Sequence, residues 1–83
     1  MEESEREQKL AAMKRLIALA EKCYDDMYEA YEQRDVNRCY RDAKDYYTDA
    51  IGLAGELGMN EEADRLYARL WHIKEVFFHQ FAG

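Results

Sequence analysis

The segment 39–51, with the sequence CYRDAKDYYTDAI, carries the apolar pattern that predicts the fold of this chain. Apolar residues in and around it recur at alternating steps of three and four, at Val36, Cys39, Ala43, Tyr46, Ala50, Leu53 and Leu57. A second line runs beside the first, through Tyr40, Tyr47, Ile51 and Ala54. This spacing is typical of an α-helix, and an apolar face two lines wide can contact two neighbours. The segment is therefore predicted to lie in the central helix of a bundle.

Two further apolar lines flank the central helix along the chain. The first comprises Leu10, Met13, Ile17, Ala20, Tyr24, Met27 and Tyr31. The other comprises Ala63, Leu66, Leu70, Ile73 and Phe77. The chain contains no proline, which favours long, uninterrupted helices. We therefore predict a single all-α domain over residues 1–83, an antiparallel up-down-up three-helix bundle with helices at residues 5–33, 37–57 and 61–81.

The starts of these helices are predicted from short polar side chains that can accept hydrogen bonds from free backbone amides. Ser4 and Glu7 fit a capping box at the start of the first helix. Asp35 or Asn37 is expected to cap the second helix, and Asn60 the third.

Glycines mark the end of the second helix. Gly58, followed by the apolar Met59, predicts a residue in the left-handed conformation that stops the helix. Gly52 lies in the helix interior, where glycine costs about 1 kcal/mol relative to alanine. Either the helix is loosened there, or Gly52 and Gly55 admit a close neighbour or flank a ligand cavity.

The charge of the chain limits its partners. It has 18 acidic and 12 basic residues and a net charge of −6 at pH 7, with no basic patch. Contacts to phosphates supply most of the affinity for nucleic acids, so nucleic acid is not an expected partner. An acidic protein is also repelled by anionic membranes, and no apolar run is long enough to span one. We expect no membrane partner.

The two cysteines, Cys23 and Cys39, are isolated in the sequence and fall on expected apolar helix faces. The preferred interpretation is that both are buried, reduced thiols in a cytoplasmic protein. A disulfide between the first and second helices is the alternative.

The segment 39–51 also places a small residue, an aromatic residue four positions later and a small residue three positions after that, at Ala43, Tyr47 and Ala50. This pattern resembles the second helix of a tetratricopeptide repeat. It is equally similar to the second helix of a microtubule-interacting-and-trafficking (MIT) domain, a three-helix bundle of about this length. Tyr31, Arg34 and Gly55 depart from the tetratricopeptide pattern, and the third helix holds no second copy. The resemblance implies a helical hairpin and carries over no binding residue.

Three residues of the third helix are candidate metal ligands. His72, Glu75 and His79 are spaced by three and four residues, and two imidazoles with a carboxylate suit zinc or iron. The two histidines lie seven residues apart, about 10 Å along a helix axis, so both cannot easily hold one metal without another chain. A metal- or small-ligand-binding bundle is therefore the alternative to the function preferred below.

Three carboxylates on the second helix are candidate acid–base groups. Asp42, Asp45 and Asp49 alternate with basic residues on its outer face, which indicates a solvated surface of mixed charge. Acid–base catalysis requires a pocket that desolvates one carboxyl group, and no such pocket is indicated. We expect neither enzymatic activity nor a cofactor.

The third helix carries more aromatic residues than its core line uses. Tyr67, Trp71 and Phe78 form a second line, and Phe81 lies near its end. A small three-helix core uses one line from each outer helix, so the second line is exposed or meets a partner. Tyrosine and tryptophan are enriched at binding hot spots. We therefore predict a small, non-enzymatic interaction module, an adaptor or a homodimer, in which these four residues bind the partner. The alternative is that the bundle wraps around the rings.

Overall fold

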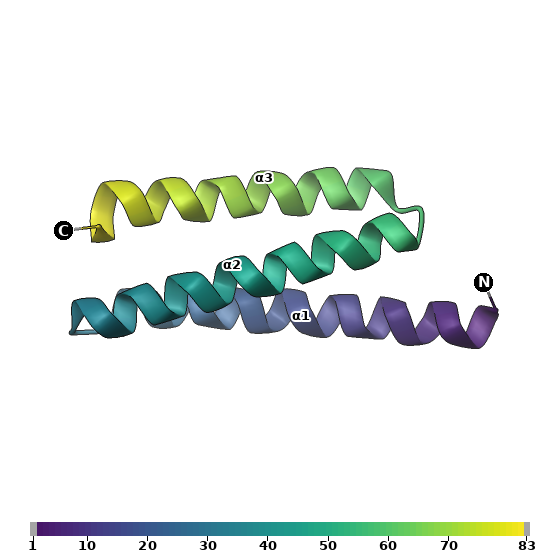
Figure 1. Cartoon of the computed structure of the whole chain (residues 1–83), viewed down its shortest axis with the longest axis horizontal. Coiled ribbons are helices and arrows are strands. Elements are labelled where there is room, and N and C mark those ends of the chain that lie inside the picture. The colour runs from purple at the N-terminus through teal and green to yellow at the C-terminus, as the bar shows by residue number, and fades with distance from the viewer. Residues whose placement is uncertain (1, 83) are drawn as a thin grey trace.

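The computed structural model describes residues 2–82, which form three α-helices followed by a π-helical segment (Figure 1). The elements are α1 (Glu3–Glu29), α2 (Gln33–Glu56), α3 (Asn60–Val76) and η1 (Phe77–Phe81). The helices run up, down and up, the two connections lie at opposite ends, and α2 lies between α1 and α3 (Figure 1). The predicted all-α three-helix bundle with a central second helix is confirmed.

The predicted apolar lines form the core. Fifteen residues are buried: Met13, Ala20, Tyr24, Met27, Val36, Ala43, Tyr47, Ala50, Ala54, Leu57, Leu66, Leu70, Ile73, Val76 and Phe77. On α2 the alanines Ala43, Ala50 and Ala54 are fully buried, and side chains this small let neighbouring helices approach closely. The packing places α2 directly against both α1 and α3.

The bundle is elongated. Its Cα atoms extend over 46 × 19 × 13 Å, and the radius of gyration is 14.0 Å. A compact domain of this length would have a radius of gyration of about 12 Å. Each outer helix therefore has a broad solvent-facing side in addition to the side that packs on α2. Within residues 2–82, no helix combines the length and apolar character that crossing a bilayer would require.

The first helix differs from the prediction at both ends. It begins at Glu3 without a side-chain cap, so the capping box of Ser4 and Glu7 is wrong. It ends at Glu29 instead of residue 33, because the backbone becomes extended at the next residue. Tyr31, predicted as the last member of the apolar line, lies in the connection and is fully exposed.

The predicted caps of the other two helices are also wrong. The second helix begins at Gln33, so Asp35 and Asn37 lie inside its first turns. The third begins at Asn60 itself, with Met59 at the N-cap and no side-chain cap. In both cases the helix begins before the first buried apolar residue, at polar residues exposed to water, where water can satisfy the free amides.

The end of α2 matches the prediction. Gly58 adopts a positive φ of 71°, its N–H donates to the carbonyl of Gly55 at 3.1 Å, and the Met59 N–H donates to that of Ala54 at 2.9 Å. These two bonds define a Schellman motif. Gly52 lies within continuous helix, and a Cβ added at Gly52 or Gly55 would meet no atom within 4 Å. No neighbouring helix of residues 2–82 therefore approaches either glycine.

Candidate interaction surface

The second aromatic line of α3 lies on the surface. Tyr67, Trp71 and Phe78 have exposed fractions of 53%, 49% and 62%. The edge of one ring meets the face of the other in the Tyr67–Trp71 pair, with ring centroids 6.4 Å apart. The Nζ atom of Lys74 lies 5.2 Å from the centre of the Trp71 ring, a cation–π contact that covers only part of it.

The central helix supports the C-terminal end of this line. Tyr40 stacks on the buried Phe77, with centroids 3.9 Å apart, and meets Phe78 edge-to-face at 6.2 Å. The Nζ atom of Lys44 lies 5.8 Å from the centre of the Tyr40 ring. We define the aromatic face by six residues: Tyr40, Lys44, Tyr67, Trp71, Lys74 and Phe78. Sequence reasoning missed the two α2 residues as site residues, although Lys44 follows Tyr40 by four residues and therefore shares its side of the helix.

Phe81, the fourth residue of the predicted surface, lies elsewhere. It is partly buried, and its ring packs edge-to-face against Tyr28 of α1, with centroids 5.0 Å apart. The cause is the π-helical segment, in which the Ala82 N–H donates to the carbonyl of Phe77 at 2.8 Å. A π-helix has more residues per turn than an α-helix, so Phe81 is carried round toward α1. The aromatic face therefore ends at Phe78.

The aromatic face carries positive charge on a chain whose net charge is −6. Among residues 2–82, neither Lys44 nor Lys74 forms an ion pair, whereas Lys9 and Lys22 both contact carboxylates. Lys44 and Lys74 instead lie over aromatic rings, and both are partly buried. The face therefore combines exposed rings with two cations available to a partner's carboxylates.

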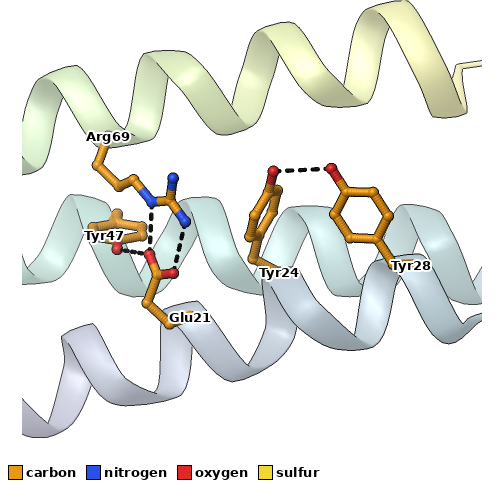
Figure 2. A network of polar contacts seen from close by, with 5 residues as sticks. All are labelled: Glu21, Tyr24, Tyr28, Tyr47 and Arg69. Atoms are coloured by element: carbon orange, nitrogen blue, oxygen red, sulfur yellow. Dashed lines mark hydrogen bonds and ion pairs between the residues drawn. The ribbon is translucent and has the colours of Figure 1, made fainter.

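A polar network joins all three helices and fixes the orientation of α3 (Figure 2). Glu21 of α1 accepts two hydrogen bonds from Arg69 of α3, from Nε at 2.9 Å and from Nη2 at 2.8 Å. The hydroxyl of Tyr47, on α2, donates to the same carboxylate. These contacts with Arg69 and Tyr47 hold the pKa of Glu21 below its ordinary value, against the opposing effect of partial burial. Burial raises the pKa of Tyr47, and the neighbouring carboxylate raises it further.

Aromatic side chains extend the network along α1. The Arg69 guanidinium lies 4.9 Å from the centre of the Tyr24 ring, and the hydroxyls of Tyr24 and Tyr28 are 3.0 Å apart (Figure 2). Burial, together with this hydrogen bond, raises the pKa of Tyr24 to about 12. Residues two apart on a helix point about 200° apart. Holding Arg69 against α1 therefore turns Trp71 toward the opposite side of α3.

The candidate metal ligands do not form a site in this chain. His72, Glu75 and His79 are all exposed, and residues 2–82 contain no group of three His, Cys, Asp or Glu side chains able to hold a metal ion. Of the candidate acid–base groups, Asp45 and Asp49 are exposed and Asp42 is partly buried. Asp42 lies 3.8 Å from the guanidinium of Arg41, as expected for a mixed-charge surface.

The two thiols are free and only partly buried. Burial is the main cause that raises the pKa of both Cys23 and Cys39, and nearby carboxylates add to the effect. The alternative of a disulfide between the first two helices is not realised. The expectation of buried thiols is correct only in part, because both positions lie at the edge of the core.

Comparisons with family models, with curated proteins and with solved structures find no match to this chain.

Proposed function

We propose that this protein is a non-enzymatic helical module that acts through protein–protein contacts, as an adaptor or by self-association, and that the aromatic face is its contact surface. The observation that carries the proposal is the line of three half-exposed rings, Tyr67 and Trp71 on one side of α3 and Phe78 in η1. The other exposed large apolar residues are Leu19 and Tyr28 on α1 and Tyr31 in the connection after it. They do not recur at the helical spacing that would place them in one line. The free thiols support placing the module in the cytoplasm.

The energetic reason for a partner lies in the area that the rings leave in water. Large aromatic side chains bury about 150–250 Å² when fully covered. Roughly half of that area remains exposed at Tyr67, Trp71 and Phe78. At about 25 cal/mol per Å², covering the remainder contributes roughly 2–3 kcal/mol per ring before the entropic cost of association. A partner that covers all three rings therefore gains roughly 6–9 kcal/mol against the entropic cost of association.

The proposal is tested by affinity capture from the native cell with three tagged forms: the wild type, Trp71→Glu and the matched control Tyr31→Glu. Both substitutions replace an exposed aromatic residue by glutamate, but Tyr31 lies in the α1–α2 connection, outside the aromatic face. We expect the wild type and Tyr31→Glu to retain a partner, either another protein or a second copy of this chain. We expect Trp71→Glu to lose it. Circular dichroism checks that each variant is folded. Equal capture by all three folded forms would overturn the proposal.

A further inference from the structure

The exposed side of α3 carries a heptad pattern that includes charged residues. Asp64, Tyr67, Trp71, Lys74 and Phe78 follow one another at steps of three, four, three and four. These are the a and d positions of a coiled-coil seam, and they share one side of the helix. All are exposed except Lys74, which is partly buried. The α3 helix therefore has two seams, one packed on α2 and one that α2 contacts only at its C-terminal end, where Tyr40 meets Phe78.

The order of residues along this second seam is symmetric. The acidic Asp64 is followed by the aromatic residues Tyr67 and Trp71 and then by the basic Lys74. The steps between them are three, four and three residues, the same in either direction along the helix. In an antiparallel pair of helices related by a two-fold axis at residue 69, Asp64 lies opposite Lys74 of the second copy. Tyr67 then lies opposite Trp71 of the second copy. Among residues 2–82 neither Asp64 nor Lys74 has an ion-pair partner.

We propose that the partner of the aromatic face is a second copy of this chain, joined through an antiparallel α3–α3 seam centred at residue 69. This inference rests on the proposed function and specifies its partner. Each dimer would contain two Asp64–Lys74 ion pairs and two Tyr67–Trp71 contacts, because a two-fold axis repeats every contact. Tyr67 and Trp71 of one copy cover those of the other, and the two ion pairs close the ends of this cluster, whereas Phe78 lies beyond them, opposite Asn60 of the second copy.

The charges also select the direction of the helices. A parallel pair would place Asp64 against Asp64 and Lys74 against Lys74, whereas the antiparallel pair joins opposite charges and opposed helix dipoles. On one flank of the seam Ala68 lies next to the axis, where its small side chain allows close approach. On the same flank Glu61 approaches Glu75 of the second copy. Both are exposed, so salt screens their repulsion.

The test is a charge swap, measured by sedimentation equilibrium of the purified full chain from low micromolar to near-millimolar concentration. The forms are the wild type, Asp64→Lys, Lys74→Asp, the double variant with both changes, and the control Lys22→Asp. The control reverses an exposed charge on α1, away from α3. We expect a wild-type dimer. Each single swap creates two repulsive pairs and should weaken dimerisation roughly tenfold, and the double variant should recover most of the loss.

The outcomes separate this inference from the proposed function. Single swaps that match the wild type, or a double variant no better than the singles, would overturn the antiparallel seam. In that case a dimer broken by Trp71→Glu would still support the proposed contact surface. A wild type that stays monomeric at every concentration would overturn the second copy as partner. The affinity-capture experiment with Trp71→Glu would then be the remaining test of the proposed function.

Discussion

Replacing Glu21 by glutamine should destabilise the bundle, because this one carboxylate accepts hydrogen bonds from both of the other helices. The substitution keeps the shape of the side chain and removes its charge. It leaves the Arg69 guanidinium without its counter-ion and weakens the acceptor for the hydroxyl of Tyr47, a residue that is only 2% exposed.

The expected loss follows from the exposure of these groups. The side chains of Glu21 and Arg69 are 36% and 38% exposed, so water screens the ion pair between them. Its contribution to stability is therefore close to that of a surface ion pair, about 0–1 kcal/mol. The amide oxygen of glutamine can still accept from the Tyr47 hydroxyl, so exchanging the charged acceptor for a neutral one costs about 1 kcal/mol and not the whole bond. With up to about 1 kcal/mol from the ion pair, the loss is about 1–2 kcal/mol, which lowers the melting temperature of a domain this size by about 4–16 °C.

The loss should also depend on pH. Arg69 and Tyr47 hold the pKa of Glu21 in the folded chain below its ordinary value of 4.5. A carboxyl group with a lowered folded-state pKa stabilises the fold fully above its ordinary pKa, and this stabilisation is lost as the pH falls through the folded-state pKa. The gap in stability between the wild type and Glu21→Gln should therefore be full at pH 7 and shrink at acidic pH, below 4.5.

The assay is thermal and urea unfolding of both forms, followed by circular dichroism across this pH range. Asp26→Asn is the matched control, because it removes a partly buried carboxylate whose ion-pair partner is the exposed Lys22, at 3.2 Å, and should cost less than about 0.5 kcal/mol. A Glu21→Gln variant as stable as this control at pH 7 would refute the reasoning. A stability gap that stays constant down to pH 3 or so would refute the electrostatic part of it.

Two further predictions concern other parts of the chain. Gly52→Ala should stabilise the protein by about 1 kcal/mol, because an added methyl group meets open space and alanine favours the helix. An unchanged or lowered melting temperature would contradict this. Cys23 and Cys39 should react slowly with a thiol reagent in native protein and fast after denaturation, because burial raises the pKa of both. Equal reaction rates in native and denatured protein would show that both thiols are accessible to the reagent in the fold.

The apolar lines predict the helices well, because burial selects residues by their position on a helix. Every predicted line contributes buried residues, and the wide apolar face of the second helix identifies it as the central one. Helix starts were not predictable in the same way. Exposed amides at a helix start can bind water, so a polar side chain such as Ser4 or Asn60 is available as a cap without being used.

The candidate surface could be predicted only in part. Tyr67, Trp71 and Phe78 lie on the surface, as the sequence pattern predicts. Phe81 instead packs against Tyr28, because the hydrogen-bond pattern changes to a π-helix over Phe77–Phe81, and nothing in the local sequence marks that change. The polar network had one signal, since the carboxylate of Glu21 lies beside the apolar line, four residues after Ile17 and three before Tyr24.

The two sides of α3 therefore differ in their surroundings. The side with Arg69 is held against α1 and α2 by the shared carboxylate of Glu21, and that contact sets the rotation of the helix. Trp71 points away from it because the two residues are separated by about 200° around the helix. An elongated bundle with one central helix leaves this far side of an outer helix uncovered. The same contacts that hold α3 in place thus leave the aromatic face exposed to water.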